Sequence, residues 1–175
     1  MTVWRNGTVT AVLIGRLCGL SRLLHASLGA SALNENDPRL VVALDEISML
    51  HAHHADVLFD HLPKRDGIDR ESLIDPGAFG HAVEIAASRG PGALAGLYRA
   101  EMLPRLVISV ADLAEGCSIA GERNLRRSLD AIGRDLAEIT ERVSAITGPQ
   151  GTLGTPLGDQ IADALSPLGE GVFNA

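Results

Sequence analysis

Apolar residues at alternating spacings of four and three are the feature that most limits what this chain can fold into. The clearest series ends near residue 146 and consists of Leu125, Leu129, Ile132, Leu136, Ile139, Val143 and Ile146. This spacing places the residues on one face of an α-helix, and such a face is buried against other helices. The pattern therefore predicts an all-α protein.

The composition agrees with helices packed on helices. Of the 175 residues, 46% are hydrophobic and only 3% are aromatic. The core must then consist mainly of Leu, Ile, Val and Ala, which suits helix packing better than a β-sandwich. A chain of this length fits one domain with a sizeable core.

Four stretches carry the helical pattern. The predicted helices cover 8–32, 38–62, 91–116 and 119–146. Asp37 and Pro38 suit the start of the second helix, as N-cap and first helical residue. We therefore expect a four-helix bundle.

Two further segments complete the predicted organisation. A long connection over 63–92, with a short helix at 76–88, either crosses the whole bundle or covers it as a lid. The bundle is expected to occupy residues 1–148. A C-terminal arm or tail rich in Gly and Pro follows over 149–175.

The second helix carries histidines where leucines are expected. Its inward series consists of Leu40, Leu44, Ile47, His51, His54, Leu58 and His61. His51 and His54 are therefore predicted to face the core, whereas His53 is predicted to lie off this stripe. Two inward imidazoles cost desolvation energy unless hydrogen bonds or a metal compensate them.

The third helix adds a carboxylate to the predicted interior. Its inward stripe consists of Leu94, Leu97, Glu101, Pro104, Ile108 and Ala111. Pro104 removes a backbone hydrogen bond and predicts a kink. Tyr98, one turn before Glu101, is a candidate donor that closes the site. Arg105, one turn after Glu101, offers the alternative of an ordinary ion pair within the helix.

These residues allow three interpretations. His51, His54 and Glu101 would hold a metal ion, with two imidazoles and one carboxylate as ligands. They would otherwise act without metal, with His54, Glu101, Tyr98 and Arg105 as the catalytic group. The third interpretation makes the histidines structural, satisfied by hydrogen bonds in the core.

Charge and cysteine content bear on partners and location. The net charge of −7 argues against a nucleic-acid surface, which needs clustered Lys and Arg. The apolar stretch over 9–28 is interrupted by Arg16 and Arg22, so no membrane span is expected. Cys18 and Cys117 are expected to be reduced thiols of a cytoplasmic protein. The C-terminal arm suggests a homodimer.

Two segments resemble a known superfamily. The stretch ALDEISMLHAHHADVLFDHLP at 43–63, with GLYRAEMLPRL at 96–106, resembles bacterial ferritin-like proteins, in a divergent branch. The resemblance implies a four-helix bundle that carries metal-binding carboxylates and histidines. Glu46 is followed at the third position by Met49 rather than His, so the full di-iron motif is missing.

What the resemblance leaves is a mononuclear site or a metal-free pocket. The mononuclear site would use His51, His54 and Glu101, with Fe as the first choice and Mn or Zn as the others. It implies a small oxidoreductase that acts on a small organic substrate. The alternative is a non-catalytic helical protein that binds a small ligand or a partner.

Overall fold

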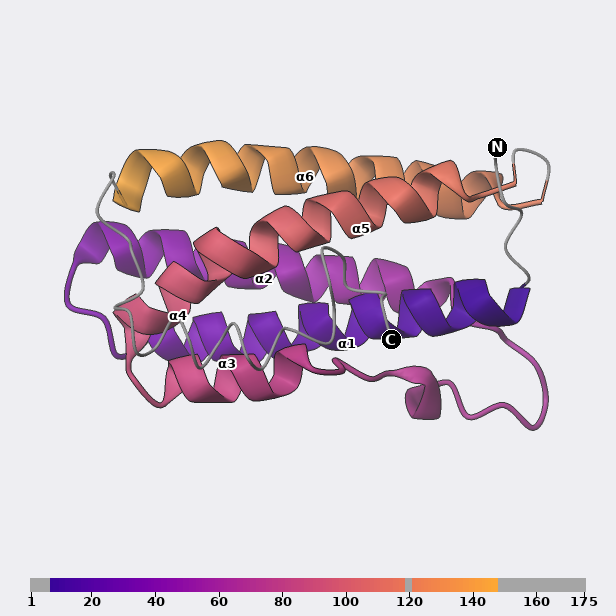
Figure 1. The fold of residues 1–175 in the computed structure, drawn as a ribbon, viewed down its shortest axis with the longest axis horizontal. Helices are drawn as coiled ribbons and strands as arrows, with labels where there is room; N and C mark the ends of the chain where they lie inside the picture. The colour runs from indigo at the N-terminus through magenta and orange to yellow at the C-terminus, as the bar shows by residue number, and fades with distance from the viewer. Residues whose placement is uncertain (1–6, 119–120, 148–175) are drawn as a thin grey trace.

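The computed structural model describes residues 7–118 and 121–147, and this part of the chain is all-helical (Figure 1). The elements are α1 (Gly7–Ala32), α2 (Pro38–Asp60), a 3-10 turn (Glu71–Leu73), α3 (Phe79–Ala87), α4 (Pro91–Leu97), a π turn (Tyr98–Met102), α5 (Leu103–Glu115) and α6 (Arg123–Thr147). The expected all-α class is confirmed for these residues. The predicted arm over 149–175 lies outside them.

Helices α1 and α2 form an antiparallel hairpin. The Asp37 carboxylate accepts a hydrogen bond of 2.9 Å from the backbone N–H of Arg39, and Pro38 occupies the first helical position. Asp37 therefore caps α2 as predicted. The leucines that recur along α1 are buried, namely Leu13, Leu17, Leu20, Leu24 and Leu28.

The third predicted helix is continuous but contains a π turn. Elements α4, the π turn and α5 follow one another without a break, and the N–H of Leu103 donates to the carbonyl of Tyr98, five residues back. A π turn places one additional residue in the helix. Pro104, whose nitrogen has no hydrogen to donate, follows directly, so the irregularity lies where a kink was predicted.

The π turn explains why the predicted inward stripe is wrong beyond Leu97. Leu94 and Leu97 are buried as expected, but Pro104, Ile108 and Ala111 are exposed and Glu101 is partly exposed. The residues that face the core instead are Met102, Leu106, Val110 and Leu113. One additional residue rotates the rest of a helix by about 100° relative to an unbroken one.

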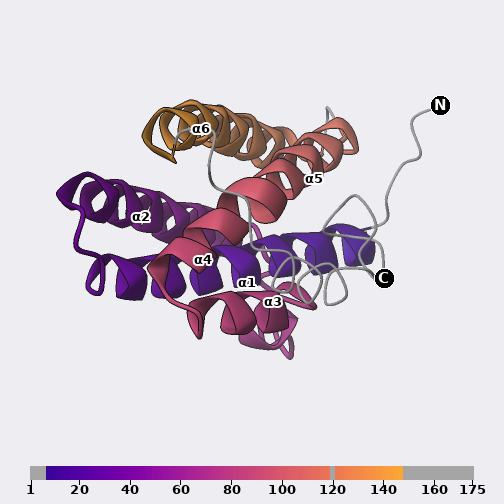
Figure 2. The ribbon, with the colours of Figure 1, turned by 60° about the vertical axis from the view of Figure 1, so that its left-hand side comes forward.

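Helix α6 pairs with α5 in a second antiparallel hairpin. It begins at Arg123, four residues after the predicted start. The predicted series is buried from Leu125 to Val143. Figures 1 and 2 show this hairpin on one side of α1 and α2, with α3 on the other side.

The long connection runs back along α1 (Figure 1). The chain leaves α2 at one end of the molecule and begins α4 at the other, so α2 and α5 run in the same direction. The predicted short helix is confirmed as α3. The connection therefore runs from one end of the helices to the other, as in the first of the two interpretations.

Glycines on α1 let the connection approach closely. A β-carbon at Gly15 would overlap the carbonyl oxygen of Leu73. A β-carbon at Gly19 would lie 2.8 Å from the nitrogen of Pro76. Because no real β-carbon tolerates such contacts, these positions require glycine.

Two arginines hold the connection onto the first hairpin. Arg22 on α1 donates two hydrogen bonds to the Glu71 carboxylate, at 2.6 and 3.3 Å. Arg22 and Arg70 both lie against the ring of Phe59 on α2, with guanidinium carbons 5.1 and 3.9 Å from its centroid. Arg70 also donates to the carbonyl of Phe59.

Helix α1 is long and apolar enough to cross a membrane by length and composition, over Val9–Ala32. In the most apolar 18-residue part of that stretch, 61% is buried inside the protein. The apolar character of α1 is therefore also what a core helix in this position requires.

Candidate functional site

Helix α2 turns His51 and His54 into the core, as predicted. Their exposed fractions are 0% and 1%, and the two rings meet edge to face with centroids 5.6 Å apart. His53, between them, is exposed. The spacing of three therefore places two imidazoles side by side in the interior.

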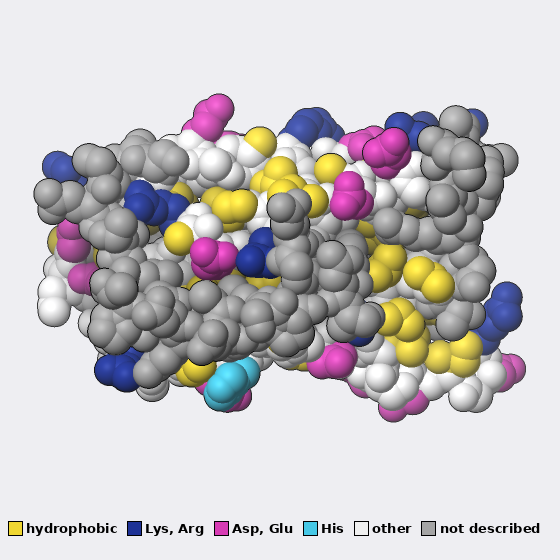
Figure 3. Space-filling view, in the orientation of Figure 1, with side chains coloured by type: hydrophobic (Ala, Val, Ile, Leu, Met, Phe, Trp, Pro, Cys, Tyr) yellow, Lys and Arg dark blue, Asp and Glu magenta, His cyan; other side chains and the backbone are white. Residues whose placement is uncertain are grey.

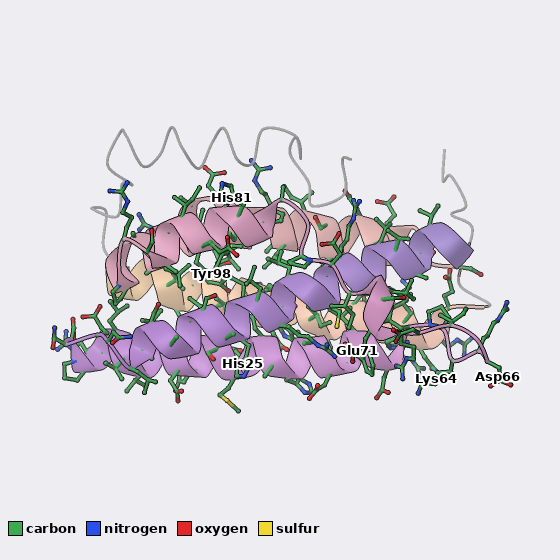
Figure 4. The ribbon with its side chains drawn as sticks, turned by 90° about the horizontal axis from the view of Figure 1, so that it is seen from below. His25, Lys64, Asp66, Glu71, His81 and Tyr98 are labelled. Carbon is green, nitrogen blue, oxygen red and sulfur yellow. The ribbon has the colours of Figure 1, made fainter. Side chains whose placement is uncertain are left out.

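Tyr98 is the partner of His51. The Tyr98 hydroxyl lies 2.9 Å from His51 Nε2, and the two rings are edge to face, with centroids 5.5 Å apart. Tyr98 is the first residue of the π turn, and Figure 4 shows it inside the stack of helices, whereas Asp66 lies at one end. Burial raises the pKa of the Tyr98 phenol above its usual value, so the hydroxyl remains a neutral donor.

His51 has no hydrogen-bond partner for its second nitrogen. Nδ1 is fully buried and unpartnered. Burial, assisted by the neighbouring His54 and His25, lowers the pKa of His51 from 6.5 to about 3. The ring is therefore neutral at physiological pH, and its two nitrogens differ in role.

Asp135 on α6 is the partner of His54. Its Oδ2 lies 3.0 Å from His54 Nε2, and 37% of the Asp135 side chain is exposed. A carboxylate can only accept, so Nε2 carries the hydrogen. Burial lowers the pKa of His54, and the bond and charge of Asp135 offset part of that shift.

Asp135 is not among the candidate residues identified from the sequence. Asp135 lies directly before Leu136, at the edge of the apolar stripe of α6. A signal exists in paired spacings: His54 and His61 lie seven residues apart on α2, as do their partners Ser128 and Asp135 on α6. Because the helices are antiparallel, equal spacings bring both pairs together.

Glu101 does not join the histidines. Its carboxylate pairs with Arg105 on the next turn at 3.3 Å, and 39% of the Glu101 side chain is exposed. This is the ion pair that was the alternative interpretation of both residues. The acid–base group of His54, Glu101, Tyr98 and Arg105 is therefore not assembled as one cluster.

The donor set does not fit the expected mononuclear metal. His51 Nε2 is bonded to Tyr98 and His54 Nε2 to Asp135, while Glu101 is bonded to Arg105. Within residues 7–118 and 121–147, no three His, Cys, Asp or Glu side chains are close enough to hold one ion. Fe, Mn and Zn each need at least three protein ligands in such a site.

Polar contacts continue along α2 where it faces α6. Glu46 pairs with Arg142 at 2.9 Å, near one end. At the other end, His61 Nε2 lies 2.9 Å from the Ser128 hydroxyl, and burial is the main cause that lowers the pKa of His61. We call the contact of α2 with α6 and Tyr98 the hairpin interface, since it joins the two helical hairpins.

A small apolar cavity lies at the same interface. It is lined by Leu40, Ala43, Leu44, Ile47, Ala95, Tyr98 and Val143. Its volume is about 20 Å³, roughly the space of one water-sized group. The ring of Tyr98 forms one wall, while its hydroxyl is held by His51.

The other three histidines, His25, His53 and His81, are exposed. On the face drawn in Figure 3, histidine covers one small area over α3, and charged side chains of both signs are interspersed. His25 on α1 is exposed and bonds the Ser48 hydroxyl at 2.9 Å. Glu122 accepts a hydrogen bond from the backbone of Ser118, before α6 begins.

Comparison of the chain with protein-family models, curated proteins and solved structures finds no match.

Proposed function

We propose that this protein binds a small, mainly apolar molecule at the cavity beside Tyr98. The observation that carries the proposal is the cavity itself, which joins an apolar lining to a tyrosine held by a buried histidine. Apolar pockets with a few placed polar groups are the usual form of ligand sites. This corresponds to the non-catalytic ligand-binding alternative.

The size of the cavity limits what enters it. A ligand places one small apolar group between α2 and α4, and the remainder lies over Leu40 and Ala95, which are partly exposed. Dry apolar cavities that take up benzene or xenon measure about 150 Å³, several times more than this one, so only a methyl-sized part of a ligand enters here. 1-Propanol and 1-butanol, which can insert one methyl group while the remainder lies on the rim, are therefore suitable probes when the natural ligand is unknown.

The test is a titration of the protein with 1-propanol and with 1-butanol, followed by amide NMR. We expect shift changes at residues around Tyr98, and we expect them to disappear in Ala95→Leu, which fills the cavity from α4. Ala100→Leu, at an exposed position of the π turn that continues α4, is the matched control and should bind as the unmodified protein does. Equal binding by Ala95→Leu would contradict the proposal.

A catalytic role is the second candidate, because one observation favours it. A carboxylate that fixes the tautomer of an imidazole, as Asp135 does for His54, is the arrangement used by general bases. An enzyme acting on a small organic substrate would use His54 as base and Tyr98 as donor. Loss of turnover with unchanged melting temperature in Asp135→Asn would support it.

The remaining expectations stay proposals. The crossing connection and parallel α2 and α5 support a distant ferritin-like four-helix arrangement. An iron-dependent oxidoreductase would need ligands beyond the group described above, and elemental analysis of purified protein tests it. From composition and charge we expect a cytoplasmic protein with no nucleic-acid or membrane partner. From the C-terminal arm we expect a homodimer.

A further inference from the structure

Histidines make most of the polar contacts at the hairpin interface. Among the described residues, Glu46, His51, His54 and His61 make polar contacts from the first hairpin to the second, within a shared apolar core. Three of these four are histidines. These polar contacts are thus made mostly by side chains whose charge changes between pH 5 and 8.

Each histidine is placed so that a proton is disfavoured while the interface is closed. His51 meets Tyr98 from the π turn, His54 from its own helix and the charge field of His25 from α1, and none of these is an anion. Nothing near it therefore compensates a positive charge, and the ring is fully buried.

His54 and His61 have more polar neighbours than His51, but burial disfavours their protonation as well. His54 faces Asp135 on α6 and the exposed His53 on its own helix. Asp135 is more than a third exposed, so water weakens its attraction for a charged His54. His61 faces Ser128 on α6, with Asp60 and Lys64 of opposite charge beside it.

We propose that the hairpin interface is an acid-operated joint: protonation of His51, His54 and His61 separates the α5/α6 hairpin from the α1/α2 hairpin, while both hairpins remain helical. Separation hydrates all three imidazoles, which then take up protons freely. After separation the two hairpins remain linked by the connection, which the Arg22–Glu71 ion pair holds against α1.

The expected steepness follows from the proton count. A histidine that is neutral when buried and free to titrate when hydrated shifts the opening equilibrium tenfold per pH unit below about 6.5. His51, whose pKa burial lowers to about 3, gives about tenfold per pH unit, and His54 and His61, whose pKa values are also lowered, add to this dependence.

The chain provides its own reporter for this equilibrium. Tyr98 is the single tyrosine of the sequence, and it lies at the interface, bonded to His51. Full-length protein labelled with ring-13C tyrosine therefore gives one set of aromatic NMR signals. Far-UV circular dichroism on the same samples reports the helix content.

Between pH 7.5 and 4.5 we expect the Tyr98 signals to move to the values of a hydrated tyrosine, with the helix signal retained. In His54→Gln/His61→Gln, whose amides still donate to Asp135 and Ser128, the transition should be shallower and occur at lower pH. His81→Gln, an exposed histidine on α3 outside the hairpin interface, is the matched control and should leave the transition unchanged.

Three results would overturn the proposal. The Tyr98 signals would stay unchanged down to pH 4.5, or they would change only together with loss of helix. The third is a double glutamine variant that titrates with the same midpoint and steepness as the unmodified protein.

Discussion

His51 combines complete burial with an unused nitrogen, and its energetics follow from counting donors and acceptors. Neutral His51 and Tyr98 carry one polar hydrogen each, but the single bond between them uses only one. One donor is therefore left over in either tautomer, consistent with the unpartnered Nδ1. Such a group costs roughly 1–3 kcal/mol when it is buried.

This counting predicts the outcome of a double-mutant cycle. His51→Phe and Tyr98→Phe should each destabilise the protein by about 1–3 kcal/mol, because each leaves its former partner unpaired. The double variant should lose clearly less than the sum of the two single losses. Urea unfolding at pH 7.5 measures all four corners, and simple additivity would argue against the bond.

Stability should also depend on pH through His51. Its folded-state pKa of about 3 lies below the unfolded value of 6.5, so its contribution is complete above pH 6.5 and decreases as the pH falls towards 3. We expect a loss of about 1.4 kcal/mol per pH unit from this residue. Urea midpoints between pH 7.5 and 5 measure it, and His51→Phe should flatten the dependence.

The sequence predicts these residues unevenly. His51 and His54 were assigned correctly because α2 is a regular helix, in which spacing determines the buried face. Tyr98 was a candidate from the sequence, but its contact with His51 followed only from the fold. Asp135 was missed because pairing across helices depends on their relative position along the axis, which one sequence pattern does not contain.

At the scale of elements, the π turn is where prediction and structure diverge. Helical spacing assumes 3.6 residues per turn, and one additional residue invalidates the assumption for everything that follows. Glu101 was therefore predicted inward, while the structure turns Met102 into the core instead. The presence of Pro104 indicated an irregularity but not its type.

The glycines of α1 provide a sharp test at this scale. Gly15→Ala and Gly19→Ala should each destabilise the protein by about 1–3 kcal/mol, because the β-carbon would push the connection off the helix. Gly92→Ala is the control, since a β-carbon there meets nothing within 4 Å. It should be neutral or stabilising by up to about 1 kcal/mol, through helix propensity alone. Thermal or chemical unfolding distinguishes the two classes.

At the scale of the whole molecule, two helical hairpins are joined by a connection fixed to the first. The all-α class follows from the helical spacing of apolar residues, so the sequence was informative at this level. The expected arm over 149–175 lies outside the residues that the structure describes.

Truncation tests that assignment. We expect the full chain to elute as a dimer in gel filtration and a chain ending at Gly148 to elute as a monomer with unchanged helix content. The reason is that the sequence predicts an arm rich in Gly and Pro over 149–175, and such an arm can pack on a second copy. Identical elution of both chains would show that residues 149–175 are not needed for dimer formation.

The long separation between partners at the hairpin interface also matters while the chain is being made. The residues that α2 contacts on α6 lie 67, 81 and 96 positions later in the sequence. At roughly 5–20 residues per second of synthesis, the inward face of α2 waits several seconds for its partner. During that interval, a face that carries histidines among its leucines exposes less apolar surface than one made of leucine alone. It should therefore associate less with other nascent chains.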